Sequence, residues 1–162
     1  MDRVYKDKLD SSIRLLKNAD HLVTFSYPLI KDPRLLVSGL QLLFRSLEDM
    51  TDAVLLFEQT YKNLPPGQHT NFNLKLDLLK KLSTKYNLSK DFFNMLYELH
   101  ELDKAHRNSR VEFSRRDRFV ICLDDFSLKI ITLNLLKQYL DKTKVFIYNL
   151  YLRLQKYESG SA

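Results

Sequence analysis

Apolar residues recur at helical spacing along most of this chain. The clearest series has steps that alternate between four and three residues: Leu36, Leu40, Leu43, Leu47, Met50, Val54, Phe57 and Tyr61. This heptad pattern predicts a long helix over residues 33–62 whose apolar seam packs against neighbouring helices at a shallow angle. The seam suits either the core of an intramolecular bundle or a coiled coil between two chains. We favour the bundle, because a single helical domain needs such a seam.

Four further segments repeat apolar residues with a helical period. We expect helices over residues 2–25, 72–86, 90–106 and 125–157. Ser89 is a suitable N-cap for the helix over 90–106, and Asp124 or Asp125 for the last one. Pro28 and Pro33 interrupt the pattern after the first helix, since a proline disfavours helix at the residue before it. Residues 63–70 hold two prolines and a glycine and predict a loop.

The segment over residues 107–123 loses the helical period. It alternates loosely between apolar and polar residues, which favours an extended excursion or a short hairpin with Arg115, Arg116 and Asp117 at its tip. A helix capped by Ser114, with Asp117 three residues on, is the alternative. We therefore predict an all-α fold: an up-and-down bundle of four to five helices with an irregular or hairpin excursion before the long last helix.

Length and composition narrow the class of protein. A chain of 162 residues fits one domain, which we place at 1–158, with 159–162 as a frayed tail or an artificial remnant. Three glycines are too few for the phosphate-binding loops of nucleotide-binding folds. The single cysteine, Cys122, excludes a disulfide framework within one chain and suits a reducing cytoplasm. No apolar run approaches 18 residues, so we expect no membrane span.

Positive charge is concentrated between Lys104 and Arg118. This stretch carries a formal charge of +4, out of +6 for the whole chain, and holds five of the ten arginines. Guanidinium groups bind phosphates bidentately and keep their charge, and nearby aromatic rings can stack on bases. The predicted nucleic-acid-binding residues are Lys104, His106, Arg107, Asn108, Arg110, Arg115, Arg116 and Arg118, with Phe113, Phe119 and Tyr97 as candidate stacking faces. The alternative is a solvated loop, partly neutralised by nearby acidic residues.

Other clusters of chemically active residues point to structural roles. His100 and His106 stand about 120° apart around a helix axis and nearly two turns apart along it, so they cannot easily share a metal ion. Asp103 is better placed as the i,i+4 ion partner of Arg107. Asp124 and Asp125 are more simply explained by helix capping than by acid–base chemistry. We expect no catalytic residue, no metal ion and no cofactor.

The layout resembles the HEPN family of small helical-bundle proteins over roughly residues 34–157. The resemblance rests on the long second helix, L-L-V-S-G-L-Q-L-L-F-R-S-L-E-D-M, and on R-N-S-R-V-E-F before a long last helix. Many members are metal-independent RNases whose dimers bring two copies of an arginine–histidine motif across a shared cleft. Arg107 and Asn108 match the first half of that motif. The histidine, due at Glu112, Phe113 or Ser114, is missing, which implies a non-nucleolytic member with a basic surface.

These observations give three hypotheses of function. The first is a cytoplasmic, non-catalytic domain that binds nucleic acid, RNA before DNA, through the arginine stretch. The second is a helical protein-interaction module, either one half of a homodimer or a partner of a nucleotidyltransferase-like protein. The third is a metal-independent RNase of HEPN type. We expect binding rather than catalysis, because the second half of the family motif is missing.

Overall fold

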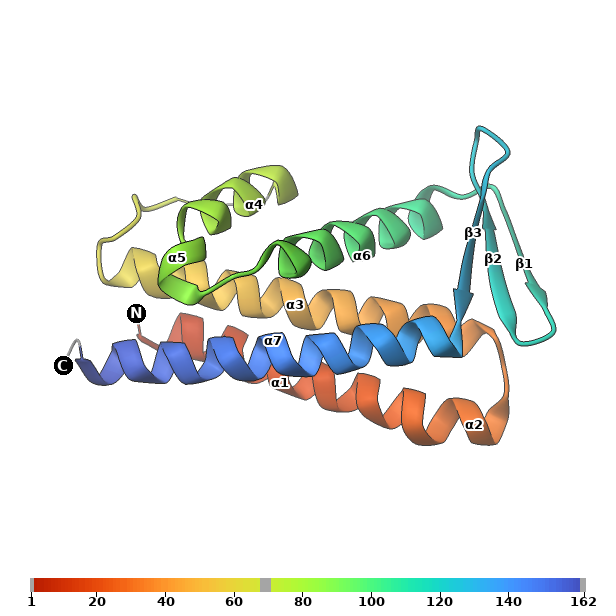
Figure 1. The fold of residues 1–162 in the computed structure, drawn as a ribbon, viewed down its shortest axis with the longest axis horizontal. Coiled ribbons are helices and arrows are strands. Elements are labelled where there is room, and N and C mark those ends of the chain that lie inside the picture. Colours follow the sequence, from red (N-terminus) through yellow and green to blue (C-terminus); the bar gives the residue numbers. More distant parts are fainter. Residues whose placement is uncertain (1, 68–70, 161–162) are drawn as a thin grey trace.

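Three long helices lie side by side and form the body of the molecule (Figure 1). The computed structural model describes residues 2–67 and 71–160. The predicted loop over 63–70 therefore lies partly outside the described residues, and so do positions 161 and 162 of the predicted tail. The long helices are α1 (Asp2–His21), α3 (Arg34–Thr60) and α7 (Leu133–Gly160), and α6 (Lys90–Asn108) packs along α3.

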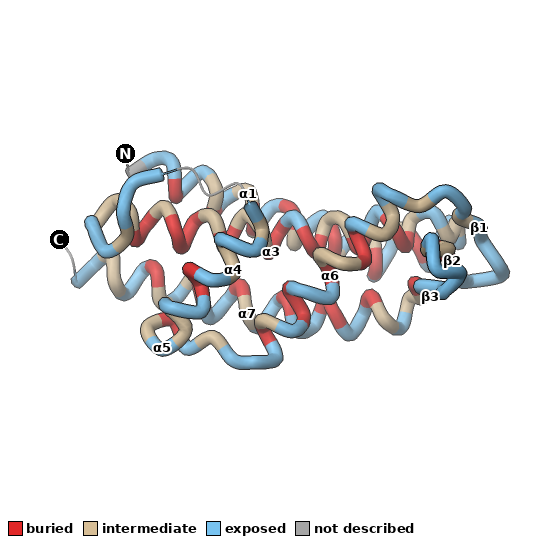
Figure 2. Tube along the Cα trace, turned by 90° about the horizontal axis from the view of Figure 1, so that it is seen from above, coloured by how far each residue is buried: buried red, intermediate tan, exposed pale blue. Residues whose placement is uncertain are grey.

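The apolar seam of α3 occupies the centre of the core. Leu36, Leu40, Leu43, Leu47, Met50, Val54 and Phe57 are all buried, and Tyr61 is half-buried. Figure 2 shows the buried residues along α3 and on the sides of its neighbours that face it. Gly39 lets the neighbouring side chains approach closely, because a Cβ there would stand 3.1 Å from Leu136 Cδ1 and 3.2 Å from Leu22 Cδ2. The predicted bundle core is confirmed.

The first helical segment runs further than its prolines suggest. After α1, a π-helical turn over Leu22–Ser26 leads into α2 (Tyr27–Ile30), and the chain leaves the helix at Lys31, whose φ is 57°. In the π turn the Tyr27 N–H donates to Leu22 O, which widens the helix just before Pro28. The expected break at Tyr27 is therefore wrong, because the wider turn accommodates the proline.

Two short helices and a capped long one follow the loop after α3. Residues expected to form one helix over 72–86 form α4 (Phe72–Lys81) and α5 (Ser83–Tyr86). Asn71 Oδ1 accepts hydrogen bonds from the backbone N–H groups of Asn73 and Leu74, which starts α4. Ser89 Oγ accepts from the Phe92 N–H at 3.2 Å, so the predicted cap of α6 is confirmed.

The all-α prediction needs a correction. A three-stranded antiparallel sheet, in the order β1-β2-β3, covers the end of the bundle furthest from the two chain ends (Figure 1). Its strands are β1 (Val111–Arg115), β2 (Arg118–Cys122) and β3 (Leu128–Thr132). The hairpin of β1 and β2 is the excursion that the sequence predicts. The fold is mostly helical, but it is not a pure helical bundle.

The third strand displaces the start of the last helix from Asp125 to Leu133. Asp125 Oδ1 accepts from Ser127 N at 3.0 Å and thereby closes a turn between β2 and β3, instead of capping a helix. The β-branched residues Ile130, Ile131 and Thr132 follow, and they favour strand. Phe126 and Ile130 are four residues apart, which imitates a helical period although both are exposed. None of the helices in residues 2–67 and 71–160 is both long enough and apolar enough to cross a membrane.

Glu48, on α3, gives a pH-dependent prediction. Burial, opposed by Lys75 and reinforced by three nearby aspartates, raises the pKa of its carboxyl group. The folded protein therefore binds the proton of the Glu48 carboxyl more tightly than the unfolded chain does. The free energy of unfolding then falls as the pH rises from the unfolded pKa of about 4.3 through the higher pKa of the folded state. We expect Glu48→Gln to raise the free energy of unfolding at pH 7, with a gain that disappears near pH 4.

Urea unfolding at both pH values measures this effect. Asp10→Asn, on the exposed side of α1, removes the same charge and is the control. A Glu48→Gln protein less stable than the wild type at pH 7 would show that the attraction of Lys75 outweighs the cost of burial.

Candidate nucleic-acid interface

The hairpin of β1 and β2 presents the arginine-rich part of the chain. Arg115 pairs with Arg118 across the strands, and Arg116 and Asp117 form the two-residue turn between them. Arg116 has a φ of 57°, in the left-handed region that a tight hairpin turn requires. The Tyr27 hydroxyl donates to the Asp117 carbonyl at 3.5 Å, so the tip of the hairpin rests on α2. Burial and the nearby Asp117 raise the pKa of Tyr27, which keeps this donor protonated.

Four of the five predicted arginines have no carboxylate partner. Arg115, Arg116 and Arg118 lie at the tip, and Arg110 lies just before β1 at the other end of that strand. All four are exposed, and within residues 2–67 and 71–160 no carboxylate oxygen lies within 4.0 Å of their side-chain nitrogens. Their charges are therefore available to an external anion.

The other predicted residues at the end of α6 are engaged in contacts within the chain. Arg107 Nε lies 3.0 Å from Asp103 Oδ2, so the predicted i,i+4 ion pair is confirmed. His106 Nδ1 lies 2.7 Å from Glu112 Oε1, and the Ser109 hydroxyl donates to the same oxygen. These bonds tie β1 to the end of α6. His106 thus helps to position the hairpin, Arg107 is held against α6, and neither joins the arginines at the hairpin tip.

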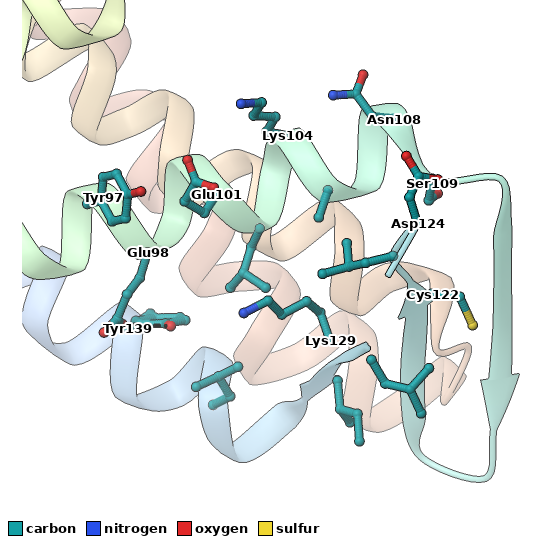
Figure 3. Close-up of a pocket in the computed structure, with 16 residues that line it drawn as sticks. Tyr97, Glu98, Glu101, Lys104, Asn108, Ser109, Cys122, Asp124, Lys129 and Tyr139 are labelled. Carbon is teal, nitrogen blue, oxygen red and sulfur yellow. Dashed lines mark hydrogen bonds between the residues drawn. The ribbon is translucent and has the colours of Figure 1, made fainter. Parts of the chain in front are cut away.

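Lys104 and Asn108 line a separate cavity of about 890 Å³ between α6, α7 and the β2–β3 turn. Figure 3 shows the side chains of Lys104 and Asn108 extending from the outer side of α6. The Lys129 side chain extends from β3 into the space below α6. Inside this cavity the Tyr139 hydroxyl donates to Glu98 Oε2 at 3.1 Å. The structure therefore does not bring the eight predicted residues together, and only four of them form the hairpin surface.

The two faces of the sheet differ sharply in burial. On the inner face, Phe119, Ile121 and Ile131 are between 0% and 7% exposed, and they cover the end of the bundle. The other face, which we call the outer face, carries five apolar residues, together with Cys122, Thr132, Arg115 and Arg118. The five apolar residues are Val111, Phe113, Val120, Leu128 and Ile130. Four of these are between 41% and 56% exposed, and only the central Val120 is buried. Of the candidate stacking aromatics, Phe113 alone lies on this face.

The outer face was not predicted from the sequence. The signal was present in the alternation of V-E-F-S-R and L-K-I-I-T, but the second stretch was assigned to a helix. Elsewhere in the described part of the chain, no group of three or more His, Cys, Asp and Glu side chains is arranged to hold a metal ion. Comparison of the chain with models of protein families, with curated proteins and with solved structures gives no match.

Proposed function

We propose that this protein binds nucleic acid, RNA before DNA, without cleaving it, through Arg110, Arg115, Arg116 and Arg118. The observation that carries the proposal is the absence of any carboxylate partner for these exposed arginines in the described residues. Arg107, by contrast, is paired with Asp103. Guanidinium groups bind phosphates bidentately, as they bind carboxylates.

The spacing of the arginines favours a chain of phosphates over a single one. Arg110 and Arg115 stand five residues apart along an extended segment, which corresponds to about 17 Å at ~3.3 Å per residue. One phosphate cannot reach both ends, but the backbone of an oligonucleotide can follow the strand. A polyanionic chain is therefore the partner that suits this surface.

Salt dependence tests the proposal. Each phosphate that an arginine neutralises releases condensed counterion, so four contacts to a single strand predict a log–log slope of affinity against salt near −3. Replacing Arg115 and Arg116 together by Ala should flatten this slope by about one to one and a half units and weaken binding to all sequences alike. Fluorescence anisotropy with a labelled oligonucleotide at several salt concentrations measures both effects.

The control is Lys80→Ala with Lys81→Ala on α4, which removes the same charge from another surface. We expect the lysine variant to keep the wild-type slope within about half a unit, which is less than one phosphate contact. Equal losses of affinity and of salt slope in the two double variants would mean that the oligonucleotide is attracted diffusely to a basic protein. The hairpin would then be a solvated loop.

Two finer assignments belong to this proposal. A cytoplasmic location is supported by Cys122, the one cysteine of the chain, which is free. Membership of the HEPN family is supported by the long α3 and α7 helices that flank the hairpin segment. In this chain position 112, where the histidine of that family could stand, is a glutamate bound to His106, which supports binding over RNA cleavage.

A protein-interaction module is the second candidate function. It is favoured by an exposed apolar stripe on α7, where Val145, Tyr148 and Leu152 are 57%, 62% and 44% exposed. Their spacing of three and four residues places them on one side of the helix. Such a stripe is typical of a helix that packs against a partner, either a second copy of the chain or another protein.

A further inference from the structure

The outer face of the sheet is a largely uncovered apolar surface, whose residues Leu128 and Ile130 also line the cavity between α6 and α7. Antiparallel pairing places Phe113 opposite Val120, and Val120 opposite Ile130, so the three side chains form a row across the sheet. Val111 and Leu128 extend the surface toward the end of the sheet where β2 turns into β3. Single exposed apolar residues are common on proteins, but a contiguous set on one sheet face usually marks a binding surface.

Two arginines stand at the hairpin end of this surface. Arg115 and Arg118 are paired, and alternation places them on the same face as Phe113 and Val120. Arg110 precedes Val111 at the opposite end of β1, one position out of step with the outer-face residues. The outer face is therefore an apolar surface with two cations at its hairpin end. The acidic residues Asp124 and Asp125 lie in the turn at the β2–β3 end.

The charge pattern leaves a second copy of the chain only one favourable way to stack on this face. Two sheets can stack face to face around a two-fold axis that runs along the strands or across them. An axis along the strands sets Arg118 against Arg118 of the other copy, which opposes like charges and costs binding free energy. An axis across the strands sets the arginine end of each sheet against the β2–β3 turn of the other copy, where Asp124 and Asp125 lie. A dimer of this second kind is an outcome that the test below distinguishes.

An anionic occupant with flat apolar groups satisfies both features. We propose that the outer face holds the unpaired bases of a single-stranded nucleic acid while the arginines hold its phosphates; this inference rests on the function proposed above. In a duplex the faces of the bases are stacked inside the helix, so a duplex can use only the arginines. Phe113 is the stacking residue, and the neighbouring aliphatic side chains widen its surface.

The dimensions of the sheet limit the number of bases. Strands of five residues at ~3.3 Å each, with ~4.8 Å between neighbouring strands, give a surface of about 17 by 10 Å. That area accommodates about two or three bases, in line with sheet platforms that stack two or three.

The test compares a single-stranded RNA of about ten nucleotides with the duplex of the same sequence. Phe113→Leu keeps an apolar residue in β1 but removes the aromatic ring. It should weaken single-strand binding about fivefold or more, because stacking on one aromatic ring contributes at least that much. The salt slope should stay unchanged, since no phosphate contact is lost. Phe113→Tyr should bind like the wild type, and duplex binding should be the same in all three proteins.

Tyr148→Leu is the matched control, because it removes an exposed aromatic ring from α7 without touching the sheet. Equal affinities of Phe113→Leu and Tyr148→Leu for the single strand, with the arginine double variant still flattening the slope, would overturn this inference and leave the proposed function standing. An unchanged slope in the arginine variant would overturn both. A concentration-dependent dimer that Phe113→Leu abolishes, measured by sedimentation, would assign the outer face to a second copy of the chain.

Discussion

Replacing Leu47 by Ala should lower the free energy of unfolding by about 2–5 kcal/mol. Leu47 lies in the middle of the α3 seam and is 0% exposed. The shorter side chain loses its transfer free energy from water, and it leaves a cavity that long helices packed on several sides cannot easily close. Urea unfolding, monitored by circular dichroism, measures this loss of stability. The midpoint of the transition should shift to lower urea, while the dependence of the unfolding free energy on urea concentration should stay the same.

Leu152→Ala provides the comparison for Leu47→Ala. Leu152 is also a leucine in a long helix, but it is 44% exposed on α7. The same chemical change should therefore alter the stability by less than about half a kcal/mol, as is usual for surface positions. If Leu47→Ala were equally harmless, the seam would not be the core of the folded monomer, and the intermolecular coiled coil would return as its explanation.

The second large loss of stability is expected for a substitution of Tyr86, in the part of the core near the chain ends. Its hydroxyl donates a hydrogen bond to Glu58 Oε1, and Lys85 Nζ lies 2.7 Å from the same oxygen. Glu58 is 0% exposed, and its other oxygen, Oε2, makes no hydrogen bond within the described residues. Tyr86 and Lys85 therefore compensate a carboxylate that has lost its water.

Tyr86→Phe should cost about 1.5–3 kcal/mol, the usual contribution of a hydrogen bond to a charged group. The ring still fills its place beside Tyr157, with which it makes an edge-on contact at 5.5 Å between centroids. The loss thus reports on the hydroxyl alone. Tyr139→Phe is the control, because that hydroxyl donates to the exposed Glu98, whose carboxylate can regain water. We expect a smaller loss of about 0.5–1.5 kcal/mol there.

The contribution of Tyr86 should also depend on pH. Burial, and after it the hydrogen bond and charge of Glu58, raises the pKa of the hydroxyl above its ordinary value. An unfolded tyrosine releases its proton near pH 10, whereas the folded one keeps it, so the unfolded state binds fewer protons above that pH. The advantage of the wild type over Tyr86→Phe should be constant from about pH 7 to 9 and should shrink above about pH 10. A difference that grows with pH would contradict this assignment.

Local rules predicted much of the fold from the sequence. The heptad spacing of Leu43 and Leu47 was enough to place both in the core, because apolar residues three and four apart share one side of a helix. The Ser89 cap and the ion pair of Asp103 with Arg107 depend on groups within four residues of each other. Interactions of this kind require no knowledge of distant segments, and the structure confirms all three.

The outer face, by contrast, was decided by tertiary structure. Alternation along β2 assigns Phe119 and Val120 to opposite faces, but it does not say which face the bundle covers. That choice depends on α3 and α7, which begin at the sheet and contact β2 and β3, so that Phe119 and Ile131 are buried and Phe113 and Ile130 stay exposed. β3 was missed for a related reason: its short strand pattern competes with the helical spacing of Phe126 and Ile130, and pairing with β2 decides in favour of the strand. A sheet joins distant segments by hydrogen bonds between strands, whereas a helix satisfies its own backbone, so the sequence determined the helices and the tertiary structure decided the surface of the sheet.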